Sequence, residues 1–360
     1  MLPVSKDPSS LVRPEIRALC AYHVAPAKDM VKLDAMENPY PLPAGLAAEM
    51  GARLARVAVN RYPDPTAPGL KARLRDAMQI PEHLDLLLGN GSDEVLQVIA
   101  MAIARPGAVA LAPEPSFAMY RMSAIACGLR YVGVPLAADF SLDEPALLRA
   151  IERERPAVTW IAYPNNPSGN LFPREAILAI VAAAPGLVVV DEAYYAFSGG
   201  ATLMDEVGRH PNLLLVRTLS KLGLAGLRLG AAIGGRDWLA ELEKLRLPYN
   251  VNVLSMAAAE LLLDHRDVLE AQTRAIVAER ARLEVALDRM AAVQRFPSAA
   301  NFVLVRVPDA PRAFEGLRQR GILVRNFHGS HPLLEHCLRL TVGTPDENDR
   351  LLQALVPALA

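Results

Sequence analysis

Residues 186–221 decide the fold class of this chain; they read GLVVVDEAYYAFSGGATLMDEVGRHPNLLLVRTLSK. The apolar run at 187–190 ends in an acid, Asp191, and the run at 213–216 is followed by a lysine, Lys221. Continuous apolar runs of this length are typical of strands buried on both faces of a parallel sheet. Because ligands bind beyond the carboxyl ends of such strands, we expect the acid and the lysine to face one site.

The same pattern recurs towards the N-terminus. Apolar runs at 84–88, 108–112 and 157–162 are each followed by a different polar segment, and helical patterns separate them. This alternation predicts an α/β fold, in which a large domain carries a mostly parallel sheet flanked by helices.

The flanking segments have a different character. Residues 1–45 are rich in proline and weakly periodic, which predicts an N-terminal arm that also completes part of a small domain. Residues 255–290 form a long amphipathic stretch without Pro or Gly, read as one helix or two end to end. Strands at 301–307 and 338–342 around a helix at 311–320 predict a smaller α+β domain. We therefore divide the chain into an arm (1–45), a large domain (46–255), and a connecting helix with a small C-terminal domain (256–360).

Composition excludes several classes of protein. The 360 residues include 38 Lys and Arg against 39 Asp and Glu, and this balance argues against nucleic-acid or anionic-membrane surfaces as partners. The first ten residues lack the apolar core of a secretory signal, and no apolar run is long enough to span a bilayer. Three widely spaced cysteines favour a reducing, cytoplasmic environment.

A lysine and an acid at neighbouring strand ends indicate a specific cofactor chemistry. A buried lysine can form an imine with a carbonyl, and an acid can keep a pyridine nitrogen protonated. Pyridoxal phosphate requires both. Taken alone, Lys221 is typical of a surface lysine, and Asp191 is typical of a helix cap or a salt-bridge member. Only the two residues together indicate this cofactor.

The segment GNGSDE at 89–94 offers a place for the phosphate of that cofactor. It runs into a helical pattern, whose first N–H groups are free to bind an anion, and Ser92 adds a hydroxyl. It is not a dinucleotide fingerprint, because Glu94 stands where the last glycine is required. Ser220 and Arg228, on either side of the lysine, are candidates to complete the phosphate site.

Three further residues at strand ends suit a bound pyridine ring. Phe117 is a candidate to stack on the ring, while Asn166 and Tyr194 can each donate a hydrogen bond to its phenolic oxygen. Each signal is weak alone, and their shared position after buried strands makes the set specific.

With these residues in place, the chain resembles the class I and II aminotransferases of the fold-type I superfamily of pyridoxal-phosphate enzymes, and within it the histidinol-phosphate aminotransferases. The motifs run through nearly the whole chain in order: ENPY (37–40), RYPD (61–64), GNGSDE (89–94), YPNNPSGN (163–170), VVDEAYYAF (189–197), RTLSKLGLAGLRLG (217–230), ANFVLVR (300–306), GILVRNF (321–327) and LRLTVGT (338–344).

The resemblance implies a role for each matching residue. Lys221 would be the Schiff-base lysine and proton shuttle, and the other cofactor-binding residues would be Ser92, Asp93, Phe117, Asn166, Asp191, Tyr194, Ser220 and Arg228, with Tyr62 reaching in from a partner subunit. The implied catalytic set is Lys221, Asp191, Tyr194 and Asn166, and the implied substrate-binding residues are Tyr22, Arg325 and Arg339. A homodimer with shared active sites follows from the role of Tyr62.

Two features depart from the family pattern. Arg228 lies seven residues after Lys221, one fewer than the spacing we associate with the family, so its loop must be tighter. Met36 stands where many relatives carry a polar residue, which weakens the transfer of roles to the arm.

The segment 328–337 invites a metal-site interpretation that we do not adopt. It gathers His328, His331, Glu335, His336 and Cys337, yet HPLLEH has one residue too many for the HxxEH motif and contains a proline. We expect a polar loop near the domain junction and no metal.

The expected activity is transamination between L-histidinol phosphate and 2-oxoglutarate, in histidine biosynthesis, with a small amino donor and an oxo-acid acceptor as the only substrates. Alternatives that the residues leave open are an aromatic amino-acid aminotransferase, a pyridoxal-phosphate decarboxylase of a phosphorylated amino acid, and a catalytically silent ligand sensor. Dependence on an oxo acid distinguishes them.

Overall fold

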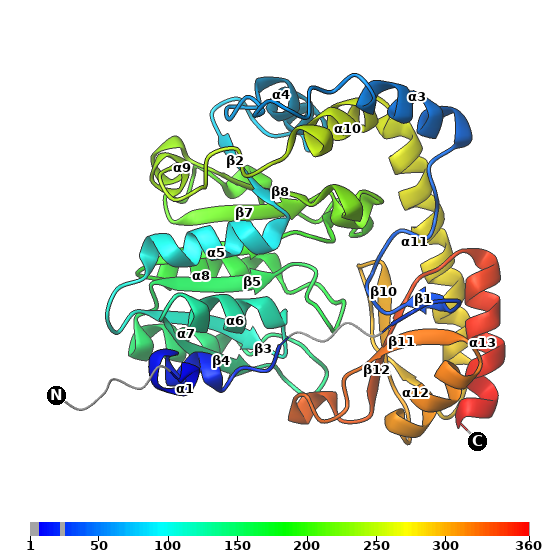
Figure 1. The fold of residues 1–360 in the computed structure, drawn as a ribbon. Coiled ribbons are helices and arrows are strands. Elements are labelled where there is room, and N and C mark those ends of the chain that lie inside the picture. The colour runs from blue at the N-terminus through cyan, green and yellow to red at the C-terminus, as the bar shows by residue number, and fades with distance from the viewer. Residues whose placement is uncertain (1–6, 22–25, 360) are drawn as a thin grey trace.

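The computed structural model describes residues 7–21 and 26–359. Two sheets with their own helices lie side by side, and the long helix α11 (Arg266–Asp288) runs along the outer side of the smaller sheet (Figure 1). Among the described residues, no helix is both long and apolar enough to cross a bilayer.

The larger sheet has seven strands in the order β2-β8-β7-β6-β5-β3-β4. All neighbours pair in parallel except β8, which is antiparallel to both β2 and β7. The five predicted strands are confirmed, with ends shifted by two residues at most. The bounds are β2 (Asp85–Asn90), β3 (Val109–Glu114), β4 (Arg130–Pro135), β5 (Val158–Ala162), β6 (Leu187–Asp191), β7 (Leu213–Thr218) and β8 (Leu229–Gly234).

Sequence patterning missed β4 and β8 for different reasons. β4 is only partly buried along its length, so it lacks a continuous apolar run. β8 reads LGAAIG, and small residues give little hydrophobic signal. Gly230 is nevertheless required, because a Cβ there would lie 2.4 Å from the backbone nitrogen of Ser92.

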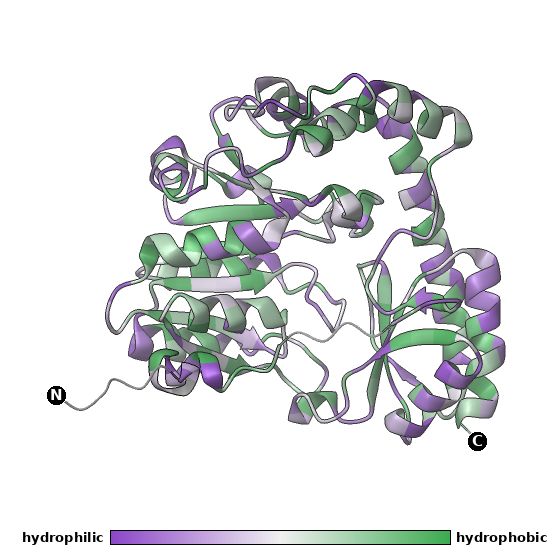
Figure 2. Ribbon diagram, viewed as in Figure 1, coloured by the Kyte–Doolittle hydropathy of each residue, from purple (hydrophilic) through white to green (hydrophobic). Residues whose placement is uncertain are grey.

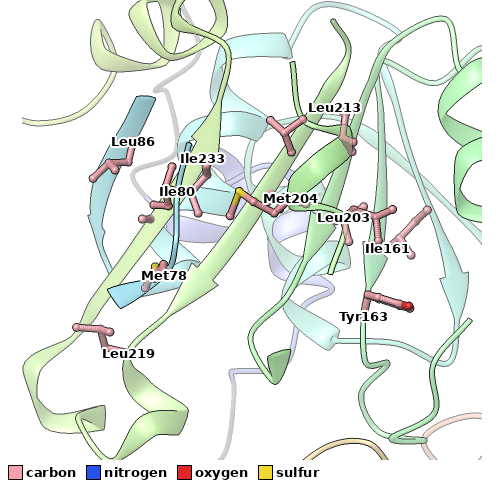
Figure 3. Packing of buried hydrophobic residues seen from close by; sticks show 14 of the residues in the cluster. Met78, Ile80, Leu86, Ile161, Tyr163, Leu203, Met204, Leu213, Leu219 and Ile233 are labelled. Carbon is pink, nitrogen blue, oxygen red and sulfur yellow. The ribbon is translucent and has the colours of Figure 1, made fainter. Parts of the chain in front are cut away.

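Helices cover both faces of this sheet, and side chains alternate between them. Val188 and Val190 pack into one apolar cluster, part of which Figure 3 shows, and Val189 packs into another on the opposite face. The strands are correspondingly among the most hydrophobic segments in Figure 2. The first face is covered by α4 (Pro68–Ala77), α7 (Glu144–Glu154), α8 (Arg174–Ala183) and α10 (Val253–Asp264), with α3 (Ala44–Leu54) against α10; the second is covered by α5 (Ser92–Ile103), α6 (Ala118–Ala126) and α9 (Arg236–Glu243).

The smaller sheet has the order β1-β11-β12-β10-β9, and β1, from the N-terminal segment, pairs in parallel with β11. The predicted pair of consecutive helices is confirmed, since α10 and α11 meet at His265. The division of the chain at residues 45 and 255 stays a prediction. The bounds are β1 (Val31–Leu33), β9 (Gln294–Arg295), β10 (Phe302–Arg306), β11 (Ile322–Asn326), β12 (Cys337–Thr341), α12 (Ala310–Gln319) and α13 (Pro345–Leu359).

Short helical turns complete the chain. They are α1 (Pro8–Leu11) and α2 (Pro14–Arg17) near the N-terminus, and the 3-10 turns η1 (Tyr195–Phe197), η2 (Met204–Glu206), η3 (Ser220–Leu222), η4 (Ala225–Leu227) and η5 (Pro332–Leu334). The parallel strands of the larger sheet point their carboxyl ends towards the smaller sheet (Figure 1). The polar residues that follow those strands therefore meet at one edge.

Candidate active site

A cavity of about 530 Å³, counted to its open mouth, lies at this edge of the larger sheet. It brings together residues that follow four different strands: Ser92 after β2, Phe117 after β3, Asn166 after β5 and Lys221 after β7, with Asp191 as the last residue of β6. The lining residues are Met36, Ser92, Asp93, Phe117, Tyr120, Ala162, Asn166, Asp191, Ala193, Tyr194, Thr218, Ser220, Lys221 and Arg228.

Asp191 is the most deeply buried acid of the cavity, at 4% exposed. Its Oδ2 accepts a hydrogen bond from the Tyr120 hydroxyl at 3.0 Å, and its Oδ1 accepts from the backbone N–H of Ala193 at 3.1 Å. Burial nevertheless dominates and raises the pKa of Asp191 to about 6. A carboxylate held this way gains stability from a positive charge brought next to it.

Lys221 is half-buried in the η3 turn, where its Nζ donates to the carbonyl oxygen of Ala35 at 3.3 Å. Burial lowers the pKa of Lys221 to about 8, and the positive charge of Arg339 adds to this effect. At pH 7 about a tenth of the lysine population is then uncharged, far more than for a lysine of ordinary pKa. An uncharged amine is the form that attacks a carbonyl.

An anion-binding cup lies at the start of α5. The first residues of that helix, Ser92 and Asp93, line the cavity, and backbone N–H groups at a helix start are free to bind an anion. Gly91, at the N-cap, has φ of 80°, and a Cβ there would lie 2.5 Å from Nη2 of Arg228. Glycine is therefore favoured by the backbone conformation, and the lack of a side chain also leaves room for the guanidinium.

The short spacing between Lys221 and Arg228 is accommodated by two consecutive 3-10 turns, η3 and η4. Arg228 itself takes a left-handed conformation, with φ of 51°. Its side chain returns to the cup, where Nη1 donates to Ser220 Oγ at 3.3 Å and Nη2 lies 3.5 Å from the carboxylate of Asp93. The guanidinium therefore faces the cup, and the comparison of this loop with the family stays a prediction.

Asn166 connects the cavity to the smaller sheet. Its Nδ2 donates to the hydroxyl of Tyr194 at 3.2 Å, while its Oδ1 accepts from Nη1 of Arg339 at 2.5 Å. Arg339, in β12, is 5% exposed and also donates to the carbonyl oxygen of Asp34 at 2.8 Å. The amide is thus oriented with its nitrogen towards Tyr194 and its oxygen towards the arginine.

The two arginines predicted to bind substrate lie on neighbouring strands. Arg325 of β11 stands directly opposite Arg339 of β12 in the antiparallel register. Opposed residues of such a pair project from the same face of the sheet, so two positive charges are brought close together. Both guanidinium groups lie near the ring of Phe327, with their carbons 5.9 and 5.2 Å from its centroid.

Tyr62 and Tyr22 lie apart from this group. Tyr62 is 80% exposed in the loop before α4, where it stacks on Tyr249 with ring centroids 4.4 Å apart. It does not line the cavity of its own chain. Tyr22 is outside the described residues, so its predicted role stays a prediction.

Sequence reasoning missed several lining residues. Tyr120 is the most consequential, because it bonds to Asp191 and packs edge-on to Phe117 at 5.6 Å between centroids. Tyr120 follows Phe117 by one helical turn, and this spacing was a signal that could have placed it near the site. Met36 also lines the cavity, with φ of 53°, and its backbone bonds to the side chains of Thr341 and Asn301. The others, Ala162, Ala193 and Thr218, adjoin predicted residues.

The segment 328–337 brings three of its five ligand-type residues together. One ligand atom from each of His328, Glu335 and His336 lies within 4.8 Å of the others, and Nδ1 of His328 is 2.9 Å from the Glu335 carboxylate. This segment follows β11 and lies outside the cavity lining. The prediction that it binds no metal stays a prediction.

Taken together, the cavity supplies an amine of lowered pKa, a buried carboxylate, an anion cup and an aromatic face at Phe117. Pyridoxal phosphate requires these four groups: the imine-forming amine, a partner for the ring nitrogen, a phosphate site and a stacking surface. The residues present fit that cofactor.

Comparison with solved structures agrees with this arrangement. Histidinol-phosphate aminotransferase from Sinorhizobium meliloti, solved in complex with pyridoxal-5'-phosphate, superimposes with a TM-score of 0.86 at 27% identity, covering 97% of this chain and 98% of that one. A crystal structure described as a putative aminotransferase from Burkholderia pseudomallei gives a TM-score of 0.79 at 31% identity, over 93% and 100% of the two chains.

Sequence comparison finds closer relatives. Histidinol-phosphate aminotransferase from Chromobacterium violaceum is 58% identical over 345 residues, which cover 96% of this chain and 97% of that protein. A protein of the same description from Ralstonia nicotianae, numbered 1, is 54% identical over 97% and 94% of the two chains. The family model "Aminotransferase class I and II" matches residues 28–355. The chain therefore belongs to the class I and II aminotransferases.

Proposed function

We propose that this protein is a pyridoxal-phosphate-dependent transaminase that moves an amino group between L-histidinol phosphate and the glutamate/2-oxoglutarate pair, in histidine biosynthesis. The observation that carries the proposal is the meeting of Lys221, Asp191 and the α5 cup in one cavity. The relatives named histidinol-phosphate aminotransferase, at 58% and 54% identity over nearly the whole chain, support this choice of substrate.

The proposed roles of the residues follow from their contacts. Pyridoxal phosphate, when bound, supplies an electron sink that stabilises a carbanion next to the transferred nitrogen. The amine of Lys221 would hold it covalently and would also move the proton at the substrate α-carbon. Asp191 keeps the ring nitrogen protonated, and Tyr120 orients the carboxylate.

The remaining lining residues fix the position of the cofactor. Asn166 and Tyr194 hold the phenolic oxygen, while Phe117 stacks on the ring. The phosphate is held by Ser92, Asp93, Ser220 and Arg228, where Asp93 acts by orienting the guanidinium.

The opposed arginines suit substrates that differ in their anionic groups. A guanidinium fork binds phosphate and carboxylate equally well. Arg325 and Arg339 can therefore serve histidinol phosphate, which carries a phosphate and no α-carboxylate, and glutamate, which carries two carboxylates. The assignment of Arg325 to the phosphate and Arg339 to the carboxylate is part of the proposal.

The proposal also includes a cytoplasmic homodimer with shared active sites. Tyr62 is 80% exposed and stacks on Tyr249, which is itself 41% exposed. Exposed stacked aromatic rings suit an interface. In the dimer, Tyr62 would reach the phosphate site of the second copy, since it does not line the cavity of its own.

Separate half-reactions test the function. Purified protein loaded with pyridoxal phosphate is mixed with histidinol phosphate alone, and conversion of the bound cofactor to its amino form is followed by absorbance. Addition of 2-oxoglutarate should restore the original spectrum and yield glutamate. Faster conversion by phenylalanine than by histidinol phosphate would favour an aromatic aminotransferase. Release of carbon dioxide from a phosphorylated amino acid without an oxo acid would indicate a decarboxylase.

A further inference from the structure

A buried ion pair lies behind the strand ends that carry Asp191 and lead to Lys221. Arg217 donates from Nε and Nη2 to Oε2 of Glu192, at 2.9 and 2.8 Å. The side chains of Arg217 and Glu192 are 3% and 0% exposed. Neither lines the cavity, so the proposed chemistry does not use them.

The pair connects the two strands to three other segments. Nη1 of Arg217 donates to the carbonyl oxygen of Met78, just after α4, and its guanidinium lies 3.8 Å from the ring centroid of Tyr195. Oε1 of Glu192 accepts from the backbone N–H of Leu203 at 2.7 Å and from the hydroxyl of Thr202 at 2.9 Å. The apolar surroundings of Met78 and Leu203 are shown in Figure 3.

Each member of the pair adjoins residues that line the cavity. Glu192 lies between Asp191 and Ala193, and Arg217 precedes Thr218. Side chains alternate along a strand, so the pair projects to the face covered by α4 while Asp191 projects to the face covered by α6, where Tyr120 meets it. The backbone N–H of Glu192 also donates to the carbonyl oxygen of Val216 at 2.8 Å. Displacement of either charged side chain would therefore move the backbone that presents the cavity residues.

Stability alone does not explain an ion pair at this depth. The desolvation of two charges largely offsets their attraction, and apolar residues of similar volume are often equally good at filling such a space. What the pair adds is direction, because two N–H groups of one planar guanidinium converge on Oε2 of Glu192 while its Oε1 accepts from Leu203 and Thr202.

We propose that Glu192 and Arg217 are positioning residues, which hold the ends of β6 and β7 in one arrangement so that Asp191 and Lys221 keep a fixed separation across the cofactor. The inference rests on the proposed function, since it concerns the bound cofactor. It predicts that removal of the pair misaligns the cofactor even where the protein remains folded.

Three variants separate positioning from stability. Glu192→Gln/Arg217→Met removes both charges and keeps an acceptor for the Leu203 amide. Arg217→Lys keeps the charge and loses the second N–H of the fork. Leu283→Ala, in the apolar core of the smaller sheet and away from the cavity, is a destabilised control. For each holoenzyme we would measure unfolding by denaturant, the pH midpoint of the visible cofactor band, and kcat and KM per bound cofactor.

The double variant should fold, bind the cofactor, show a shifted pH midpoint and lose about 10- to 100-fold in kcat with little change in KM, as expected for a small misplacement of reacting groups. Arg217→Lys should lie between it and the unmodified protein. Leu283→Ala should lose stability and keep both the midpoint and kcat.

An unchanged midpoint and kcat in the double variant would overturn the proposal and make the pair a packing element. If the double variant does not fold, Arg217→Lys decides, and unmodified values in that variant overturn the proposal equally. Failure of the proposed function is a distinct result, because the unmodified protein itself would then show no visible band or no amino transfer.

Discussion

Asp191 and Tyr62, both assigned to the cofactor, are held in very different ways. Asp191 ends a central strand, is 4% exposed and accepts two hydrogen bonds from its own chain. Tyr62 is 80% exposed in a loop and stacks on another exposed ring. The difference indicates that one chain is sufficient to order the ring-binding side of the site, whereas the role proposed for Tyr62 requires a second copy.

The largest effect is expected at Lys221, on the ordered side. Lys221→Ala removes the amine that holds the cofactor and moves the proton, so transamination should fall by about 1,000-fold or more. The visible band that borohydride bleaches in the unmodified protein should be absent, and peptide mapping of the reduced protein should place the cofactor on Lys221. Lys244→Ala is the control, since that lysine is exposed and pairs with Glu241. Label on Lys244 would contradict the assignment.

Asp191→Asn tests whether the buried carboxylate lowers the stability of the cofactor-free protein while it supports activity. Loss of the carboxylate should lower kcat by about 100-fold or more. Because burial raises the pKa of Asp191 from 3.8 to about 6, its ionisation costs the cofactor-free protein about 2–3 kcal/mol above pH 6.

The cofactor-free Asp191→Asn protein should therefore unfold at higher urea concentration than the unmodified one above pH 6, and this advantage should vanish as the pH falls towards 4. Asp143→Asn is the control, because either side chain can cap α7 there. An equal gain in both variants, or one that is independent of pH, would argue against a burial cost at Asp191.

Substitutions of Arg325 and Arg339 test how the site binds its two substrates. Loss of one charged hydrogen-bonded partner costs about 1.5–3 kcal/mol, or roughly 10- to 150-fold in kcat/KM. Arg325→Ala should penalise histidinol phosphate more than unphosphorylated histidinol. Arg339→Ala should penalise the glutamate half-reaction most, and should also disturb Asn166, to which it donates. Equal losses for the two amines in Arg325→Ala would show that this residue does not bind the phosphate.

The smallest loss of activity is expected at Tyr62. Tyr62→Phe should lower activity about tenfold, because one hydrogen bond to an anion is lost. Mixed dimers of Lys221→Ala and Tyr62→Ala subunits test whether Tyr62 acts in the site of its own subunit or in that of the partner. One of the two sites is then intact, so about half of the unmodified activity should return. Verified mixed dimers without recovery would place Tyr62 in the site of its own subunit or outside any site.

The strands of the larger sheet and the residues at their ends were predictable from the sequence. The central strands are almost wholly apolar, because both faces are buried, and polar residues lie at or just beyond their carboxyl ends. Parallel strands present their carboxyl ends at one edge, so local patterns were sufficient to predict that Asp191, Lys221 and Asn166 lie close together. The weakly apolar β4 and the glycine-rich β8 could not be found in this way.

Only the tertiary structure decided which residues outside those patterns complete the site. Tyr120 reaches Asp191 from a helix, Met36 comes from the N-terminal segment, and Arg339 crosses from the smaller sheet to Asn166. Tyr120 and Asp191 are 71 positions apart and Asn166 and Arg339 are 173 apart, and local sequence patterns carry no information about such contacts. The sequence by itself therefore determined the sheet, its polar edge and the chemistry of the lysine and acid. Folding determined their protonation, because burial, which shifts both pKa values, exists only once distant segments have packed together.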